Sequence, residues 1–377
     1  MNYETALIEL KSQHLYRALR PVKKEGKFLY LNGGKYLNLS SNDYLGIAAD
    51  EKIRVEFLKS ANYSLGSTSS RLLTGNDEIY AEFEDFLAKI YNKDAALLFN
   101  SGYHANVGIM SGLLSKKDAV FCDKLNHASI IDGIRLSGAE LHRFKHLDYD
   151  HLELLLKKHR ESAQNAIIIT ESLFSMDGDR ADFEKLIELK EKYDAILVVD
   201  EAHAFGVYGE AGLGLSEKFK EKIDLIIGTF GKAAGSMGAF CAGDGVLIEY
   251  LVNKARPLIF STALPEINVQ FSYFVTKEVF PAFSGARAHL FAISDFLRTK
   301  IKEANLKTIG DSYIIPVILG ENEAAEAFSK ELLKNGFFLL PIRHPTVAQN
   351  TARVRISLRA DLAFSDVENL AQIFSKI

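Results

Sequence analysis

The chain has 377 residues, of which 47% are hydrophobic and 25% charged, as expected for an ordinary globular protein with one large core or two unequal domains. Its net charge is −4, from 45 basic and 49 acidic side chains, so no positive excess favours binding to nucleic acid or to an anionic membrane. The two cysteines, Cys122 and Cys241, are too few for a disulfide framework or a zinc ribbon, and they indicate a reducing compartment.

The first predicted elements lie in residues 1–45. Met1 to Glu4 lead into a charged amphipathic stretch without the apolar core of a secretory signal, so we expect a cytoplasmic protein. A helix is predicted first, followed by a short hairpin over Phe28–Leu39. Asn32-Gly33-Gly34 is the expected turn, because Asn-Gly pairs readily adopt the positive φ angles of tight hairpin turns.

Residues 46–265 alternate short apolar runs with longer amphipathic ones, a pattern typical of an α/β domain with a mostly parallel sheet. The runs expected to form buried strands are Ala95–Phe99, Ala119–Cys122, Ala166–Thr170, Ile196–Val199 and Leu225–Thr229. The amphipathic segments expected to form helices include Glu78–Ile90, His151–His159 and Phe183–Lys192. We therefore predict a large domain over residues 46–265.

Within this domain, Leu225–Gly243 is almost free of charge and has to be considered as a membrane span. Lys232 lies at its middle and five glycines interrupt it, and both features disfavour a helix across a bilayer. We expect no membrane partner. Apolar surroundings instead lower the pKa of an amine, which makes a lysine a usable nucleophile.

The pattern changes near Pro265. A long helical region is predicted from Gln270 to Ala304, and a final helix begins at Ser365. Further strands are expected at Ile314–Leu319, Phe337–Leu340 and Arg353–Leu358. Residues 266–377 are therefore interpreted as a smaller C-terminal α+β domain.

The strand predicted at Ile196–Val199 ends in a carboxylate, Asp200, and His203 follows three residues on. Ligands of open α/β sheets bind at the carboxyl ends of the strands, so both side chains are candidates for a ligand site. If the motif stood alone, an aspartate that caps the next helix would be the simpler interpretation.

The strand predicted at Leu225–Thr229 leads into Lys232. A surface loop lysine is the simpler interpretation, yet its neighbours Phe230 and Ala233 are apolar. Pyridoxal phosphate (PLP) needs a lysine for its Schiff base and a carboxylate that keeps its pyridine nitrogen protonated. Asp200 and Lys232, at adjacent strand ends, provide this pair.

A candidate phosphate site follows the strand predicted at Ala95–Phe99. Asn100-Ser101-Gly102-Tyr103 combines small residues with free backbone N–H groups ahead of a helix, where phosphates bind, although an ordinary turn has the same composition. Rival motifs fail on spacing, since Gly228 and Gly231 are separated by two residues where a Walker A loop has four. The remaining histidines show no ligand spacing, so we predict no metal site.

Several stretches together resemble the α-oxoamine synthase family of fold-type I PLP enzymes, in the same order and nearly end to end. They are Leu39–Gly46, Gly66–Gly75, Ser101–Tyr103, Asn126–Ser129, Glu171–Asp179, Asp200–His203, Thr229–Lys232 and Pro345–Val347. The resemblance implies PLP as cofactor. It also implies an aspartate-aminotransferase-like α/β fold, with a mostly parallel central sheet in the large domain and a smaller α+β C-terminal domain.

The resemblance implies catalytic roles position by position. Lys232 would carry the cofactor and remove the α-proton, Asp200 would pair with the pyridine nitrogen, and His203 would hydrogen-bond the phenolic oxygen. His127 would stack on the ring, although Asn-His-Ala-Ser alone would be interpreted as a helix N-cap. The other residues implied to hold PLP are Ser101, Gly102, Tyr103, Ser175, Thr229 and, from a neighbouring subunit, Thr262.

The residues implied to bind substrate are Arg17, Asn42, His127, Thr346 and Arg355. Arg355, with Arg353 as second choice, would bind the amino acid carboxylate, which a guanidinium can hold bidentately. Arg17 and Thr346 would contact the acyl substrate.

The implied reaction is a decarboxylating condensation of an amino acid with an acyl thioester of CoA or of an acyl-carrier protein. Pro345-Thr346-Val347 and the short N-terminus favour L-alanine and a pimeloyl thioester, with glycine and acetyl-CoA as the alternative. Departures from the family pattern, at Ser67, Glu266 and Ala348, bear on the acyl substrate more than on the cofactor. A homodimer is implied as well.

A PLP-fold protein that binds ligand without catalysis is a second hypothesis. Lys232, Asp200 and His203 together argue against it.

Overall fold

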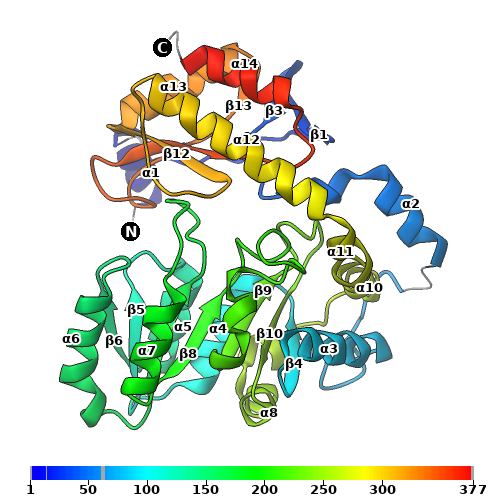
Figure 1. The fold of residues 1–377 in the computed structure, drawn as a ribbon, viewed down its shortest axis with the longest axis vertical. Helices are drawn as coiled ribbons and strands as arrows, with labels where there is room; N and C mark the ends of the chain where they lie inside the picture. Colours follow the sequence, from blue (N-terminus) through cyan, green and yellow to red (C-terminus); the bar gives the residue numbers. More distant parts are fainter. Residues whose placement is uncertain (1, 14, 61–63, 375–377) are drawn as a thin grey trace. The chain divides into compact units, whose positions relative to one another are not determined.

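The computed structural model describes residues 2–13, 15–60 and 64–374, and the chain divides into two units (Figure 1). The larger unit contains residues 50–175 and 180–285, and the smaller one contains residues up to 49, residues 176–179 and residues from 286 on. Residues 266–285, expected in the C-terminal domain, belong to the larger unit because α10 (Glu266–Phe274) packs on α3 (Glu78–Tyr91). The rings of Tyr273 and Phe83 stack there, 5.2 Å apart.

A seven-stranded sheet forms the centre of the larger unit, in the order β4-β10-β9-β8-β7-β5-β6. Its strands are β4 (Ala95–Phe99), β5 (Ala119–Asp123), β6 (Glu140–Phe144), β7 (Ala166–Glu171), β8 (Ile196–Asp200), β9 (Leu225–Thr229) and β10 (Ala239–Gly243). β10 is antiparallel to both of its neighbours, whereas the pairs from β9 to β6 are parallel. The five strands predicted from apolar runs are confirmed.

Helices pack against this sheet. Those of the larger unit, besides α3 and α10, are α2 (Glu51–Ser60), α4 (Gly102–Leu113), α5 (Ala128–Ser137), α6 (Tyr149–His159), α7 (Phe183–Lys192), α8 (Gly245–Lys254), α9 (Arg256–Ile259) and α11 (Phe280–Ala282). Every residue of β5, β7, β9 and β10 is buried, as expected for strands covered on both faces. The hydrophobic core therefore lies on both faces of the sheet, and it holds the strands and the residues at their ends in place.

The segment Leu225–Gly243 forms β9, β10 and the connection between them, with Lys232 in that connection. Phe230 N–H donates to Gly238 O across it (2.9 Å). Among the described residues, no helix has both the length and the apolarity that crossing a membrane requires.

The smaller unit has two four-stranded sheets. Its strands are β1 (Lys23–Glu25), β2 (Phe28–Leu31), β3 (Gly34–Asn38) and β13 (Phe337–Phe338) in the first, and β11 (Lys307–Thr308), β12 (Ile314–Gly320), β15 (Ala352–Ser357) and β14 (Pro341–Ile342) in the second. Its helices are α1 (Tyr3–Ser12), α12 (Ser284–Glu303), α13 (Asn322–Lys334) and α14 (Phe364–Phe374). The β2–β3 turn has positive φ at Asn32 (50°) and Gly33 (81°), which confirms the predicted hairpin.

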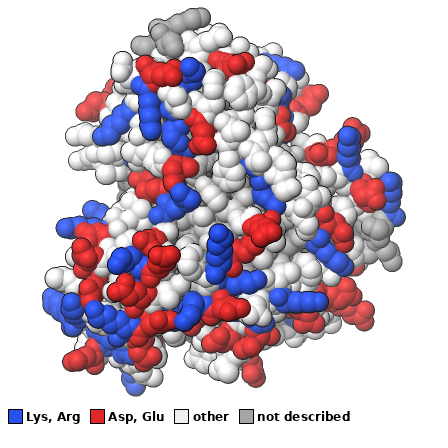
Figure 2. Space-filling view, viewed as in Figure 1, with Lys and Arg blue, Asp and Glu red and all other residues white. Residues whose placement is uncertain are grey.

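Charged side chains of both signs are interspersed over the face shown in Figure 2. No broad area of one sign stands out on that face, in keeping with the net charge of −4.

Candidate active site

The carboxyl ends of several strands meet at one edge of the large sheet. Phe99 at the end of β4 and Thr229 at the end of β9 both lie opposite Ala239. Asp200 at the end of β8 lies opposite Glu171 at the end of β7. The segments that follow these strands contain most of the predicted site residues, so the topology gathers them at this edge.

Asp200 is 4% exposed, and both of its carboxylate oxygens accept hydrogen bonds. Its Oδ2 accepts from Asn106 Nδ2 on α4 (2.8 Å), and its Oδ1 accepts from the backbone N–H of Ala202 (2.8 Å). Asn106 Nδ2 also donates to Ser129 Oγ on α5 (3.0 Å). These bonds hold a buried carboxylate in one orientation, with lone pairs left over for a cationic partner.

Glu171 is a second buried carboxyl group at this edge. The backbone N–H of His127 donates to Glu171 Oε1 (2.6 Å), and Glu171 N–H donates to Asn126 Oδ1 (3.2 Å). Burial and the negative charge of Asp200 raise the pKa of Glu171 to about 8, although the positive charge of Lys232 opposes this. The protonated form of Glu171 is therefore favoured beside Asp200.

His127 lies at the N-terminus of α5, where Nδ1 is 2.7 Å from Ser129 Oγ. Burial lowers the pKa of the imidazole and the positive charge of Lys232 lowers it further, against the opposing charges of Asp200 and Asp132. The charges of Asp200 and Lys232 therefore both act on the imidazole of His127. The structure brings these three predicted residues together.

Small and polar residues lie at the N-terminus of α4. Ser101 caps this helix, with Oγ accepting from His104 N–H (3.2 Å), and a Cβ at Gly102 would lie 3.6 Å from the Thr229 side chain. The first N–H groups of a helix have no acceptor within it and carry positive partial charge. Ser101, Gly102 and Thr229 therefore form a cradle suited to an anion such as phosphate.

The residues at this edge fit PLP. A carboxylate with spare acceptor capacity suits the protonated pyridine nitrogen, the α4 cradle suits the phosphate, and Lys232 has the amine that can condense with the aldehyde. Asn106 Oδ1 is buried and has no hydrogen-bond partner among the described residues, so one polar atom beside Asp200 is left unsatisfied.

Four further predicted residues lie around this cluster. His203 is buried three residues after Asp200, and Ser175 is half-buried four residues after Glu171. Exposed Tyr103 donates to Asp132 Oδ2 (2.8 Å), which directs its hydroxyl toward α5. The carbonyl of exposed Thr262 accepts from Asn100 Nδ2 (2.7 Å), so Thr262 lies beside the loop that follows β4.

The predicted substrate-binding residues belong, except for His127, to the smaller unit. Arg355 on β15 is buried, with Nη1 donating to Asn42 Oδ1 (3.1 Å) and Nη2 to Tyr44 Oη (3.0 Å). Within residues 2–13, 15–60 and 64–374, its Nε has no hydrogen-bond partner. Arg353, the second choice, instead forms an ion pair with Asp177.

Arg17 and Thr346 are 329 positions apart in sequence, but Arg17 Nη2 donates to Thr346 Oγ1 (3.2 Å). The structure therefore brings together the two residues predicted to contact the acyl substrate.

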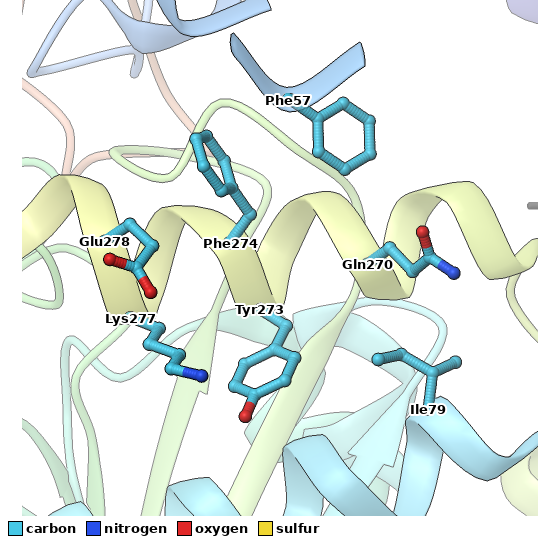
Figure 3. Close-up of a pocket in the computed structure, with 7 residues that line it drawn as sticks. All are labelled: Phe57, Ile79, Gln270, Tyr273, Phe274, Lys277 and Glu278. Atoms are coloured by element: carbon cyan, nitrogen blue, oxygen red, sulfur yellow. The ribbon is translucent and has the colours of Figure 1, made fainter. Parts of the chain in front are cut away.

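A cavity of about 200 Å³ lies elsewhere in the larger unit, where Phe57 of α2 faces α10 and the π-helix after it, Val275–Val279 (Figure 3). Its lining consists of Phe57, Ile79, Gln270, Tyr273, Phe274, Lys277 and Glu278. None of these was predicted as a site residue, and the cavity does not include the edge that carries Asp200.

The site residues that were not predicted are the carboxyl group of Glu171 and several amides and hydroxyls that support the predicted residues. Asn106, Asn126 and Ser129 fall inside or beside the quoted stretches but carried no chemical signal of their own. Their supporting role depends on where helices α4 and α5 begin in the fold. The sequence pattern alone does not define these positions.

Comparisons with known proteins agree with this geometry. The chain matches the aminotransferase class I and II family over residues 34–374. A protein of Glaesserella parasuis named "Putative 8-amino-7-oxononanoate synthase" is 51% identical over 360 residues, which cover 94% of each chain.

Two solved structures are similar throughout. One is a lysine-to-alanine variant of serine palmitoyltransferase from S. paucimobilis with bound PLP–myriocin aldimine (26% identity, TM-score 0.90, 99% of this chain and 96% of that one). The other is 8-amino-7-oxononanoate synthase from Francisella tularensis (28% identity, TM-score 0.73, 90% of this chain and 97% of that one).

Sheet topology and structural neighbours together define the fold-type I class of PLP-dependent transferases, which confirms the expected fold class. The chain belongs to the aminotransferase class I and II family, and within it to the α-oxoamine synthases.

Proposed function

We propose that the chain catalyses a PLP-dependent decarboxylating condensation of L-alanine with a pimeloyl thioester, which yields 8-amino-7-oxononanoate, CO2 and the free thiol. The observation that carries the proposal is the buried Asp200–Asn106 pair in one electrostatic field with Lys232 and His127. The relative that is 51% identical supports the choice of substrates.

When bound, PLP would accept electrons from the α-carbon of the amino acid. Asp200 would hold the protonated pyridine nitrogen, because a buried carboxylate strongly favours an adjacent cation. Asn106 would act as a positioning residue, since its bond to Oδ2 fixes the plane of that carboxylate. His203 and Ser175 would donate to the phenolic oxygen.

Lys232 would carry the cofactor and, once displaced by the amino acid, take the α-proton on Nζ. Lys232 is half-buried, and its neighbours Phe230, Ala233 and Ala234 are buried and apolar. The lowered pKa of His127 keeps that imidazole neutral near pH 7, so it adds no second cation while it packs on the cofactor.

Backbone N–H groups at the N-terminus of α4 would bind the phosphate, together with the hydroxyls of Ser101 and Thr229. A Cβ at Gly102 would lie 3.6 Å from the Thr229 side chain, so Gly102 and Thr229 lie side by side at this helix N-terminus. Tyr103 would cover the cradle, and Thr262 of a second subunit would complete it.

Arg355 would bind the amino acid carboxylate. Its guanidinium is buried on polar but uncharged partners, Asn42 and Tyr44, so its charge is not neutralised by an acid among the described residues of its unit. The ion pair with Asp177 makes Arg353 a weaker candidate. Arg17 and Thr346 would contact the acyl substrate.

Exposed apolar side chains support a homodimer. Leu73 and Phe260 are 79% and 70% exposed, and the bridge between Ser70 and Thr262 brings their two segments side by side. Large apolar side chains exposed next to each other favour a contact with a second chain at this patch of Leu73 and Phe260.

The test is a substrate panel with purified, PLP-loaded protein. Alanine, glycine and serine are each combined with pimeloyl-, acetyl-, succinyl- and palmitoyl-thioesters, and thiol and CO2 release are measured. We expect alanine with the pimeloyl thioester to have the highest kcat/KM. A preference for glycine with acetyl-CoA, or for serine with palmitoyl-CoA, would refute the proposed substrates.

The same assay tests Arg355. Arg355→Lys should raise KM for alanine, because the bidentate fork is lost. Arg54→Lys, an exposed arginine on α2, serves as the control and should leave KM unchanged.

A further inference from the structure

Three potential metal ligands converge at the outer edge of the large sheet. Glu140 and His142 lie two positions apart on β6, the last strand of the sheet, so their side chains share one face. His159 ends α6, which packs against β6. Strands β5, β7 and β8 separate this place from β9 and Lys232.

The separations suit one ion. Glu140 Oε1 is 3.3 Å from His142 Nε2 and 3.7 Å from His159 Nδ1, and all three ligand atoms lie within 4.8 Å of one another. A tetrahedral Zn²⁺ with ligands at about 2.0–2.1 Å places its ligand atoms roughly 3.3 Å apart. Small side-chain rotations would therefore bring all three atoms into the coordination shell.

His142 gives an independent sign that a partner belongs here. The residue is 9% exposed, and within the described part of the chain its buried Nε2 makes no hydrogen bond, although the Glu140 carboxylate lies 3.3 Å away. Buried polar atoms are nearly always satisfied, so an imidazole nitrogen without a hydrogen bond beside two other potential ligand atoms calls for an explanation. The His142 and His159 rings, stacked 3.8 Å apart, hold both nitrogens near the same carboxylate oxygen.

We propose that Glu140, His142 and His159 bind a divalent first-row metal ion, with Zn²⁺ as the best match. Two imidazoles and one carboxylate are ligands that Zn²⁺ favours, and three protein ligands leave the fourth position for water. The ion would fasten the C-terminus of α6 to the edge strand, which has no further strand beside it. This site is separate from the one around Lys232.

Zinc binding is measured by calorimetry on the PLP-loaded protein, with Mg²⁺ as a hard cation that should not bind. Wild type should take up one Zn²⁺ per chain and unfold at a higher temperature with it, until a chelator removes the ion. Glu140→Gln and His159→Gln should weaken binding by more than the roughly 10–100-fold that loss of an outer-shell partner causes.

His151→Gln is the matched control, because His151 lies on the same helix and bonds to Lys145 N–H outside the cluster. It should bind zinc as wild type does. Co²⁺ should give the intense visible bands of tetrahedral coordination in wild type and in His151→Gln only. Wild-type affinity in Glu140→Gln and His159→Gln, or no uptake by the folded wild type, would overturn the proposal.

Discussion

Glu171 is the group at the site whose ionisation departs most clearly from ordinary behaviour. It is fully enclosed at the end of β7, accepts from His127 N–H and lies in the field of Asp200. Because burial is the largest cause, its pKa rises from 4.5 to about 8, and at neutral pH the folded chain holds a proton that the unfolded chain releases.

This difference in proton binding makes the stability of the folded chain depend on pH in one direction. A carboxyl group with a raised folded-state pKa contributes stability that is complete below pH 4.5 and is lost as pH rises through about 8. In PLP-free protein, Glu171→Gln cannot titrate and should lack this loss. The free energy of unfolding of wild type should therefore fall relative to the variant between about pH 5 and pH 8, as measured by denaturant melts. Parallel pH profiles would show that Glu171 titrates normally.

Among single residues, those with distinctive chemistry could be predicted from the sequence. Lys232 and Asp200 follow apolar strands and stand out by type, so their placement together could be predicted. Asn106 and Ser129 could not, because an amide or a hydroxyl on a helix is common and matters here only through its distance to Asp200.

Helices α4 and α5 carry Asn106 and Ser129, which support Asp200, and the close approach of these helices depends on one glycine. A Cβ at Gly133 would lie 2.8 Å from Asn106 O and from Met110 Cβ, which is too close for undisturbed packing. Asn106 belongs to α4, so any widening of this contact also moves the partner of Asp200.

Gly133→Ala should destabilise the protein by about 1–3 kcal/mol, the usual cost of overpacking, and should weaken PLP binding as well. Denaturant unfolding and an absorbance titration with PLP measure the two effects. Gly285→Ala is the control, because a Cβ there meets open space in α12, and alanine there should be neutral or stabilising. Equal stability of the two variants would contradict the close-packing argument.

The elements were predictable where their patterns were strong. Buried parallel strands such as β7 and β8 are continuous apolar runs bounded by polar residues, and they were found. β10 was missed because Ala-Phe-Cys-Ala-Gly has few β-branched residues, and β6 because an edge strand is only half apolar. The membership of residues 266–285 depends on ring contacts such as that of Tyr273, which no local pattern reveals.

At the scale of the whole molecule, we expect two chains of 42.0 kDa to associate through the patch that contains Leu73 and Phe260. Leu73→Glu combined with Phe260→Glu places charges in that contact and should give a monomer by light scattering, with weaker PLP binding. Val246→Glu changes an equally exposed side chain on α8 and should remain dimeric. If the double variant stays dimeric, the interface does not lie at Leu73 and Phe260.

The proposed function depends on which amine binds the cofactor. Borohydride reduction of the PLP-loaded protein links the aldehyde carbon permanently to that amine, and peptide mapping then identifies the residue. We predict the label on Lys232 in wild type, and none there in Lys232→Ala, which should still fold. A label on any other lysine of the wild-type chain would contradict the proposed site.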